Sequence, residues 1–140
     1  MRKAILLLGA AALSACSLDR TALRRVAGVL ERGRIAALDE PDWQTGREAM
    51  ASQLKLLETL LVSDPANRAL LRLAAEGFGG SSFLFLEDAE PARAKGFYLR
   101  GRDHALAALA LKRSFRNLSS RLIDDFENIL RTATKDDVPD

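Results

Sequence analysis

The sequence contains very few of the residues that build redox centres, metal sites and nucleophilic active sites. Among its 140 residues there is one cysteine, Cys16, and one histidine, His104. A single cysteine excludes a disulfide within the chain, and a single histidine excludes most metal sites and every catalytic scheme that needs two imidazoles. An excess of one charge is also missing, because 21 basic residues face 19 acidic ones. The formal charge of +2 therefore gives only slight reason to expect a nucleic-acid partner.

Hydrophobic residues, in contrast, are abundant enough for a folded core. They make up 48% of the chain, and charged residues make up 29%. This composition excludes intrinsic disorder as the main state. The length suits one domain and is short for two. We therefore expect one small globular domain.

The first sixteen residues have the pattern of a bacterial export signal. Two positive charges, Arg2 and Lys3, precede twelve uncharged residues that end at Ala15. This run is well short of the roughly 20 apolar residues that a membrane-spanning helix needs, and it fits the apolar region of a cleavable signal peptide. The alternative is a buried N-terminal helix with an ordinary core cysteine, but such a helix rarely opens with this pattern.

The run Leu13-Ser14-Ala15-Cys16 resembles the lipobox of bacterial lipoproteins. In that motif the small residues fit the signal peptidase, and the cysteine sulfur receives a diacylglyceryl group before cleavage. The resemblance implies a signal peptide over residues 1–15, a mature domain over residues 16–140, and lipid attachment at Cys16. Stable anchoring needs more than one acyl chain, and Ser17 in the next position favours sorting to the outer membrane. We expect a lipid-anchored protein of the cell envelope that faces the periplasm.

Removal of the signal peptide changes the charge balance. Without Arg2 and Lys3, 19 basic residues remain against 19 acidic ones, so the mature chain is neutral. The slight basicity then belongs to the export signal. We therefore expect no nucleic-acid partner.

The rest of the chain has helical periodicity and almost no alternating pattern, which predicts an all-α fold. The expected helices are residues 20–33, ending at Gly33, then 41–62, 65–87, 91–112 and 115–132. Each places apolar side chains three and four positions apart, so that one face of the helix is buried. These predicted faces comprise Leu23, Val26, Ala27 and Leu30; Met50, Leu54, Leu57 and Leu61; Leu70, Leu71, Ala74 and Phe78; Ala94, Phe97, Tyr98, Gly101, Ala105 and Leu109; and Phe115, Leu118, Leu122, Phe126, Ile129 and Ala133.

Four prolines divide this pattern. Pro41, Pro65, Pro91 and Pro139 each follow or closely follow an acidic residue, and proline is favoured at the first position of a helix. Each proline therefore predicts a helix start. Short connections such as residues 62–64 make neighbouring helices antiparallel. We expect repeated antiparallel hairpins in a short α-solenoid similar to tetratricopeptide repeats, with a period longer than their roughly 34 residues.

Glycines lie in the third and fourth predicted helices, where each lowers the stability of the helix by up to about 1 kcal/mol relative to alanine. The third helix contains Gly77, Gly79 and Gly80, and Gly96 and Gly101 on the fourth could offer matching grooves that let the two backbones approach closely. Alternatively, Gly79-Gly80 breaks the helix and leaves residues 83–86 as a separate turn. The pattern fits both arrangements.

No group of residues has the spacing of an active site. The run Gly79-Gly80-Ser81-Ser82 lacks the Gly-Lys pair of a phosphate-binding loop, and Phe83 stands where a nucleophile elbow needs glycine. Asp103 precedes His104, but neighbouring residues of a helix point about 100° apart. The acidic clusters do not have calcium-loop spacing. We therefore expect no enzyme activity, no cofactor and no metal site.

Three stretches resemble the TatT component family of TRAP (tripartite ATP-independent periplasmic) transporters. They are LKLLETLL at residues 54–61, followed by Ser63-Asp64-Pro65; LLRLAAEGF at residues 70–78; and ARAKGFYLRGRDHAL at residues 92–106. The third is similar to the sequence ARAKRLYLRARDYAL of that family. The resemblance covers about residues 50–112. It identifies the chain as similar to the N-terminal half of this family.

The resemblance implies a periplasmic lipoprotein built from tetratricopeptide-like hairpins. Such proteins are thought to assist the periplasmic solute-binding protein of the transporter in the uptake of an organic solute. The implied partners are this solute-binding protein, the membrane through the N-terminal lipid, and a second copy of the chain in a homo-oligomer. The resemblance assigns no ligand-contacting residue.

Family members continue for roughly as many residues again. Residues 135–140 have the composition of another helix start, after which the sequence ends. We therefore expect a domain truncated at its C-terminus, either as a shortened member or as a fragment of a longer one.

A structural lipoprotein that acts as a scaffold for envelope assembly is the alternative function. It would share the anchor and the helices and lack the link to transport. Neighbouring genes for a solute-binding protein and for membrane subunits of a TRAP transporter would favour the transport role.

The lipid anchor can be tested at one residue. Cys16→Ala removes the sulfur that accepts the lipid, so we expect the protein to leave the membrane fraction. Fractionation of cells followed by immunoblotting measures this. Unchanged membrane association of the variant would contradict the lipoprotein assignment.

Overall fold

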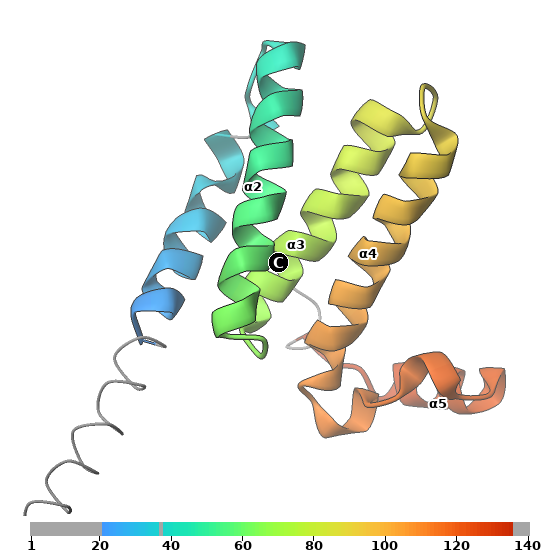
Figure 1. Ribbon diagram of the computed structural model, residues 1–140. Coiled ribbons are helices and arrows are strands. Elements are labelled where there is room, and N and C mark those ends of the chain that lie inside the picture. Colours follow the sequence, from blue (N-terminus) through green and yellow to red (C-terminus); the bar gives the residue numbers. More distant parts are fainter. Residues whose placement is uncertain (1–20, 37, 136–140) are drawn as a thin grey trace, which may run out of the picture. The chain divides into compact units, whose positions relative to one another are not determined.

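The computed structural model describes residues 21–36 and 38–135, and these residues form helices and turns without a strand among them (Figure 1). The predicted all-α class is therefore confirmed. The chain forms two compact units, residues 1–70 and 71–140. Cys16, the predicted signal peptide and Pro139 lie outside the described residues.

In the first unit, a helical stretch over residues 21–36 precedes α2 (Trp43–Ser63), which runs in the opposite direction (Figure 1). The predicted end of the first helix at Gly33 is wrong, because the helix continues to residue 36. A glycine ends a helix when it adopts a left-handed conformation, and none of the described glycines has a positive φ. Gly33 therefore lies inside the helix.

The starts of α2 and α3 (Arg68–Ser81) differ from the prediction that Pro41 and Pro65 begin helices. Asp42 caps α2, where its Oδ1 accepts a hydrogen bond of 2.6 Å from the Thr45 N–H. Asn67 does the same for α3, with its Oδ1 at 3.2 Å from the Leu70 nitrogen. The first N–H groups of a helix need such acceptors, so the helices begin after Asp42 and Asn67.

Pro91 does begin a helix, as predicted, because it is at the start of α4 (Pro91–Ala110).

In α2, the predicted buried face is also confirmed. Leu54, Leu57 and Leu61 are buried, whereas Leu56 remains 46% exposed. Positions three and four apart lie on one side of a helix, which is why the spacing identified the buried face.

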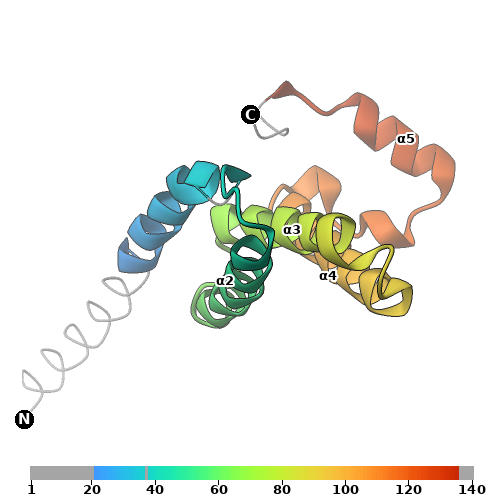
Figure 2. The same ribbon diagram turned by 90° about the horizontal axis from the view of Figure 1, so that it is seen from above.

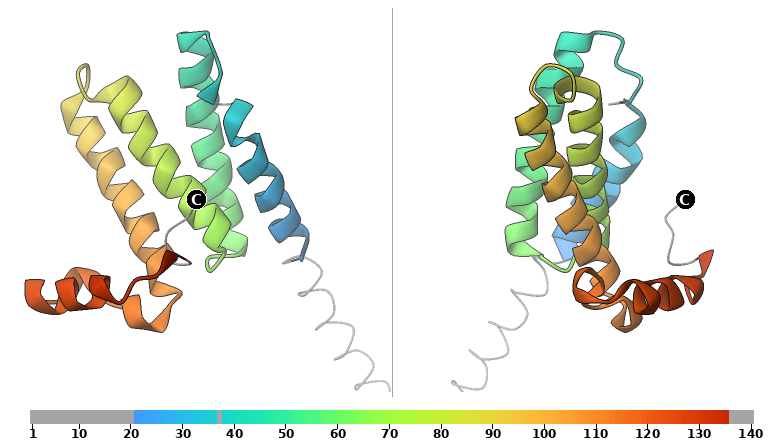
Figure 3. Two further views of the ribbon diagram at one scale, coloured as in Figure 1. Left: turned by 180° about the vertical axis from the view of Figure 1, so that it is seen from behind. Right: turned by 90° about the vertical axis from the view of Figure 1, so that its right-hand side faces the viewer.

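In the second unit, α3 and α4 run antiparallel and lie side by side in every view (Figure 1, Figure 2 and Figure 3). The two helices come close together at Gly101, where an added Cβ would lie 3.0 Å from the Ala75 carbonyl oxygen and 3.3 Å from the Gly79 nitrogen. This confirms the predicted close packing at Gly101. It does not extend to Gly79, Gly80 and Gly96, because an added Cβ at each of these would have nothing within 4 Å.

The alternative prediction, a helix broken at Gly79-Gly80, is wrong. The helix runs on without a break from Arg68 to Leu86, although its last turn, η1 (Ser82–Leu86), is π-helical. Two glycines therefore lie inside a continuous helix. An added Cβ at either of them would have nothing within 4 Å.

The fifth predicted helix, residues 115–132, is wrong over its first half. Two short 3₁₀ turns, η2 (Arg113–Phe115) and η3 (Leu118–Ser120), precede a shorter helix, α5 (Ile123–Arg131). Asn117 between them has a left-handed φ of 60°, and its carbonyl oxygen accepts a hydrogen bond from Ser120 Oγ at 3.0 Å. Asparagine and serine side chains that bond locally compete with a helix.

This change divides the predicted apolar face. Phe115 and Leu118 are buried in the turns, which contact α4. On α5 and just before it, Ile123 is 75% exposed and Leu122 is 77% exposed. The apolar residues of this segment therefore have helical spacing, but they do not lie on one continuous helix that could bury them together.

Substitution of two glycines of α4 tests the close approach. Gly101→Ala would push a methyl group against the α3 backbone, and we expect a loss of about 1–3 kcal/mol in the free energy of unfolding. Gly96→Ala is the matched control: it meets open space and should gain roughly 0.5–1 kcal/mol from helix propensity. Urea unfolding followed by circular dichroism measures both. Equal effects of the two substitutions would contradict close packing at Gly101.

Candidate binding surfaces

Asp103 and His104, which were considered as a catalytic pair from the sequence, take part in structural contacts. Asp103 Oδ1 accepts hydrogen bonds from Arg102, at 3.0 Å from Nε and 2.7 Å from Nη2. The His104 ring instead stacks on the Phe78 ring, with centroids 5.6 Å apart and planes at 17°. Asp103 is therefore not the partner that orients the imidazole, in agreement with the sequence prediction. Within residues 21–36 and 38–135, no three His, Cys, Asp or Glu side chains are grouped to hold a metal ion.

Phe78 is the centre of an aromatic cluster between α3 and α4. Its ring is fully buried, and Phe97 meets it edge-on, with centroids 5.3 Å apart. The Arg100 guanidinium carbon lies 4.0 Å from the Phe78 centroid, a favourable position for a cation–π interaction. Together with the stack of His104, these contacts hold α4 against α3. The only imidazole of the chain thus belongs to the packing of the hairpin.

The end of α3 widens into the π-helical turn η1. The Glu87 N–H donates to the Ser82 carbonyl oxygen at 2.9 Å, a bond that spans five residues. Such turns are rare and often occur at functional sites. Leu86 is buried, whereas Phe83 is 69% exposed and Leu84 is 51% exposed. The turn therefore presents two large apolar side chains to solvent.

Two side-chain bonds tie η1 to α4. Ser82 Oγ, which is fully buried, donates to the Ala94 carbonyl oxygen at 2.7 Å. Tyr98 Oη donates to Glu87 Oε2 at 2.5 Å. This bond to the Glu87 carboxylate is the largest cause that raises the pKa of the Tyr98 hydroxyl; partial desolvation and the nearby negative charge act in the same direction. The turn is thus held in place at both of its ends.

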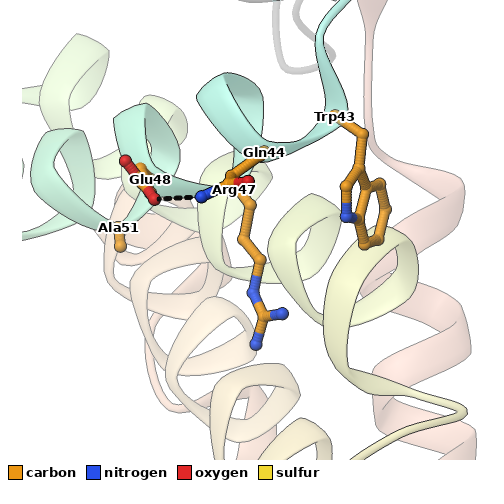
Figure 4. A pocket seen from close by; sticks show the side chains of 5 residues that line it. All are labelled: Trp43, Gln44, Arg47, Glu48 and Ala51. Carbon is orange, nitrogen blue, oxygen red and sulfur yellow. Dashed lines mark hydrogen bonds between the residues drawn. The ribbon is translucent and has the colours of Figure 1, made fainter.

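An open hollow lies along the first turns of α2. It has a volume of about 390 Å³, and its lining residues are spaced one and four positions apart, so they share one side of the helix. Trp43, the only tryptophan of the chain, is 58% exposed at this hollow. Its indole and the Arg47 guanidinium project from the same side of α2 (Figure 4). The lining residues are Trp43, Gln44, Arg47, Glu48 and Ala51.

The acidic groups near this hollow are bound within their own helix. Gln44 Nε2 donates to Glu48 Oε1 at 3.1 Å (Figure 4). Asp42 accepts the Thr45 N–H, and this hydrogen bond lowers the pKa of its carboxyl group. The negative charges are therefore held by local donors.

No motif in the sequence singles out Trp43 and Arg47. The available signal was a lone tryptophan directly after a capping aspartate, with an arginine four positions further on. That spacing places both on one side of a helix. Their exposure could not be inferred, because tryptophan is buried to a large extent in most proteins.

One helical stretch has the length and apolar character of a membrane span. Among the described helices this is Arg68–Leu86, and 44% of its apolar window is buried. Ser82 Oγ and the Phe78 ring, two of its side chains, are engaged by α4. The stretch is therefore the core helix of the α3–α4 hairpin.

Two neighbouring serines test how η1 is held. Ser82→Ala removes the buried hydrogen bond to Ala94, and we expect a loss of about 1 kcal/mol in the free energy of unfolding. Ser81→Ala is the control, because the buried Ser81 Oγ has no hydrogen-bond partner among the described residues. Loss of this hydroxyl group should leave the free energy of unfolding unchanged or raise it slightly. Thermal or urea unfolding distinguishes the two, and a larger loss from Ser81→Ala would contradict the assignment.

Comparison with known proteins gives one family. The family model described as TRAP transporter T-component matches residues 39–140, well over half of the chain. No curated protein and no solved structure matches the chain significantly. The match includes α2, the α3–α4 hairpin and α5, and it agrees with the resemblance seen in residues 50–112. The chain belongs to the TRAP transporter T-component family.

Proposed function

We propose that this protein is a lipid-anchored accessory component that faces the periplasm and binds the solute-binding protein of a TRAP transporter. The observation that carries the proposal is the family match over residues 39–140. The family gives a transport accessory component of the bacterial cell envelope. The anchor, the orientation and the partner are the parts that we add.

The lipid anchor is proposed at Cys16. Support comes from the charged pair Arg2-Lys3, the short apolar run and the lipobox-like residues 13–16. An acylated N-terminus would hold the helical domain at a membrane surface, and Ser17 favours the outer membrane. A solute-binding protein diffusing in the periplasm would then find its accessory component at a fixed surface.

Binding by helical hairpins fits the described residues better than catalysis does. His104, Asp103 and Ser82 are engaged in packing or hydrogen bonds, whereas Trp43 and Phe83 are exposed. Exposed aromatic side chains on rigid helices are typical of protein-binding surfaces. We also propose that the α3–α4 hairpin is one unit of a tetratricopeptide-like array. The scaffold role would share these features, and the family match favours transport over it.

A pull-down tests the proposed partner. The purified full chain, immobilised through a C-terminal tag, should retain the solute-binding protein of the TRAP transporter from the same organism. A solute-binding protein of an unrelated transporter is the control and should pass through. No retention at high protein concentration, with circular dichroism showing folded helices, would contradict the proposal.

A further inference from the structure

We propose that the helical stretch over residues 21–36 (Figure 1) lies flat on the membrane and binds anionic lipid headgroups through Arg25 and Arg32. Val29, which is exposed between them, enters the apolar edge of the headgroup region. This inference rests on the proposed lipid anchor at Cys16, which would bring the helix to the membrane. It adds to that anchor a second contact that selects for lipid charge.

Positive charge is concentrated in this helix. Residues 21–36 contain four arginines and one glutamate, whereas the chain after Ala15 is neutral as a whole. Arg25 and Arg32 are exposed, and neither forms an ion pair with another residue of the described part of the chain. Each basic side chain near an anionic membrane surface raises the affinity for it about fivefold. The two guanidinium groups are therefore available to lipid headgroups.

These arginines lie on the side of the helix that is turned away from its buried side. Ala27 is fully buried, and the leucines four residues before it and three residues after it are half-buried. Arg25, Val29 and Arg32 each follow a residue of this buried set by two positions, which is a rotation of about 200° around the helix. Their own spacing of four and three residues places them on one side. We call these three residues the basic face.

The basic face combines charge with an apolar centre. Val29 is 59% exposed and lies one turn from either arginine. Arginine side chains can lay their stems along apolar surface while the charged ends stay at the headgroups, and an amphipathic face of this kind reaches the boundary between headgroups and acyl chains. Glu31, the single acidic residue of the helix, is two positions after Val29. It therefore lies about 200° around the helix and outside the basic face.

The position of the helix in the chain favours lipid as the occupant of this face. Thr21, the first described residue, is five residues after Cys16, and five residues span at most about 18 Å. An acylated Cys16 would therefore keep the first turn of the helix within this distance of the membrane surface. Another protein would have to diffuse to the basic face, whereas the anchor would place lipid beside it permanently.

The first measurement is the preference of the acylated protein, purified from membranes, for anionic vesicles. The protein partitions between vesicles of phosphatidylcholine alone and vesicles that also contain phosphatidylglycerol. Because the acyl chains insert into both, the partition ratio isolates the headgroup contact. This preference should fall about fivefold in Arg25→Gln and in Arg32→Gln. Lys55→Gln is the matched control, since the Lys55 side chain is 76% exposed on α2, and it should keep the full preference.

A spin label reports whether residue 29 reaches the lipid. Cys16 is the only cysteine of the chain, and acylation blocks its sulfur, so Val29→Cys provides a single reactive thiol. On anionic vesicles this label should become accessible to oxygen and protected from a water-soluble nickel complex, as measured by electron paramagnetic resonance. Ser52→Cys, at an exposed position of α2, is the control, and its label should remain accessible to the nickel complex.

The outcomes separate this inference from the proposed anchor. If mass spectrometry finds lipid on Cys16 and the protein shows no preference for anionic vesicles, the basic face is wrong and the anchor stands. If Cys16 carries no lipid, the anchor fails and the inference fails with it. A preference that Lys55→Gln lowers as much as Arg25→Gln does would reflect the charge of the whole chain and overturn the inference. A label at residue 29 that couples to a second copy, or is immobilised by the solute-binding protein, without gaining access to oxygen would assign the face to a protein and overturn it as well.

Discussion

The close approach of α3 and α4 at Gly101 is the constraint on which the second unit depends. A Cβ at this position would lie 3.0 Å from the Ala75 carbonyl oxygen, so a larger residue would force the helices apart. At this separation Ser82 Oγ reaches the Ala94 carbonyl oxygen, and Tyr98 reaches Glu87. These bonds are short and directional. They exist because glycine allows the two backbones to come close.

The same packing decides which side chains remain available for function. Phe78 is buried under Phe97, Arg100 and His104, so the only imidazole of the chain is part of the core of the hairpin. The π-helical turn leaves Phe83 in solvent. Residues that the sequence presented as chemically active are therefore structural, and the exposed residues are aromatic and apolar. The proposed binding role rests on this distribution.

The two surfaces described differ in what they offer a partner. The turn η1 exposes Phe83 and Leu84, which are apolar without a selective charge of their own. The start of α2 exposes the Trp43 indole and carries Arg47 on the same side of the helix (Figure 4).

Much of the fold could be predicted because it depends on local spacing. Positions along single helices gave the α-helical class, the buried face of Leu54, Leu57 and Leu61, and the close packing at Gly101. The helix starts at Asp42 and Asn67 were missed in favour of nearby prolines, although a side-chain acceptor for the first N–H groups decides where a helix begins.

The sequence by itself determined the helical class and the family. Only the tertiary structure decided that Asn117 interrupts the last predicted helix, that Ser82 bonds to α4, and that Trp43 stays exposed. The physical reason is that helical periodicity is a property of one segment. Burial and hydrogen bonding between segments depend on neighbours that are distant in the sequence.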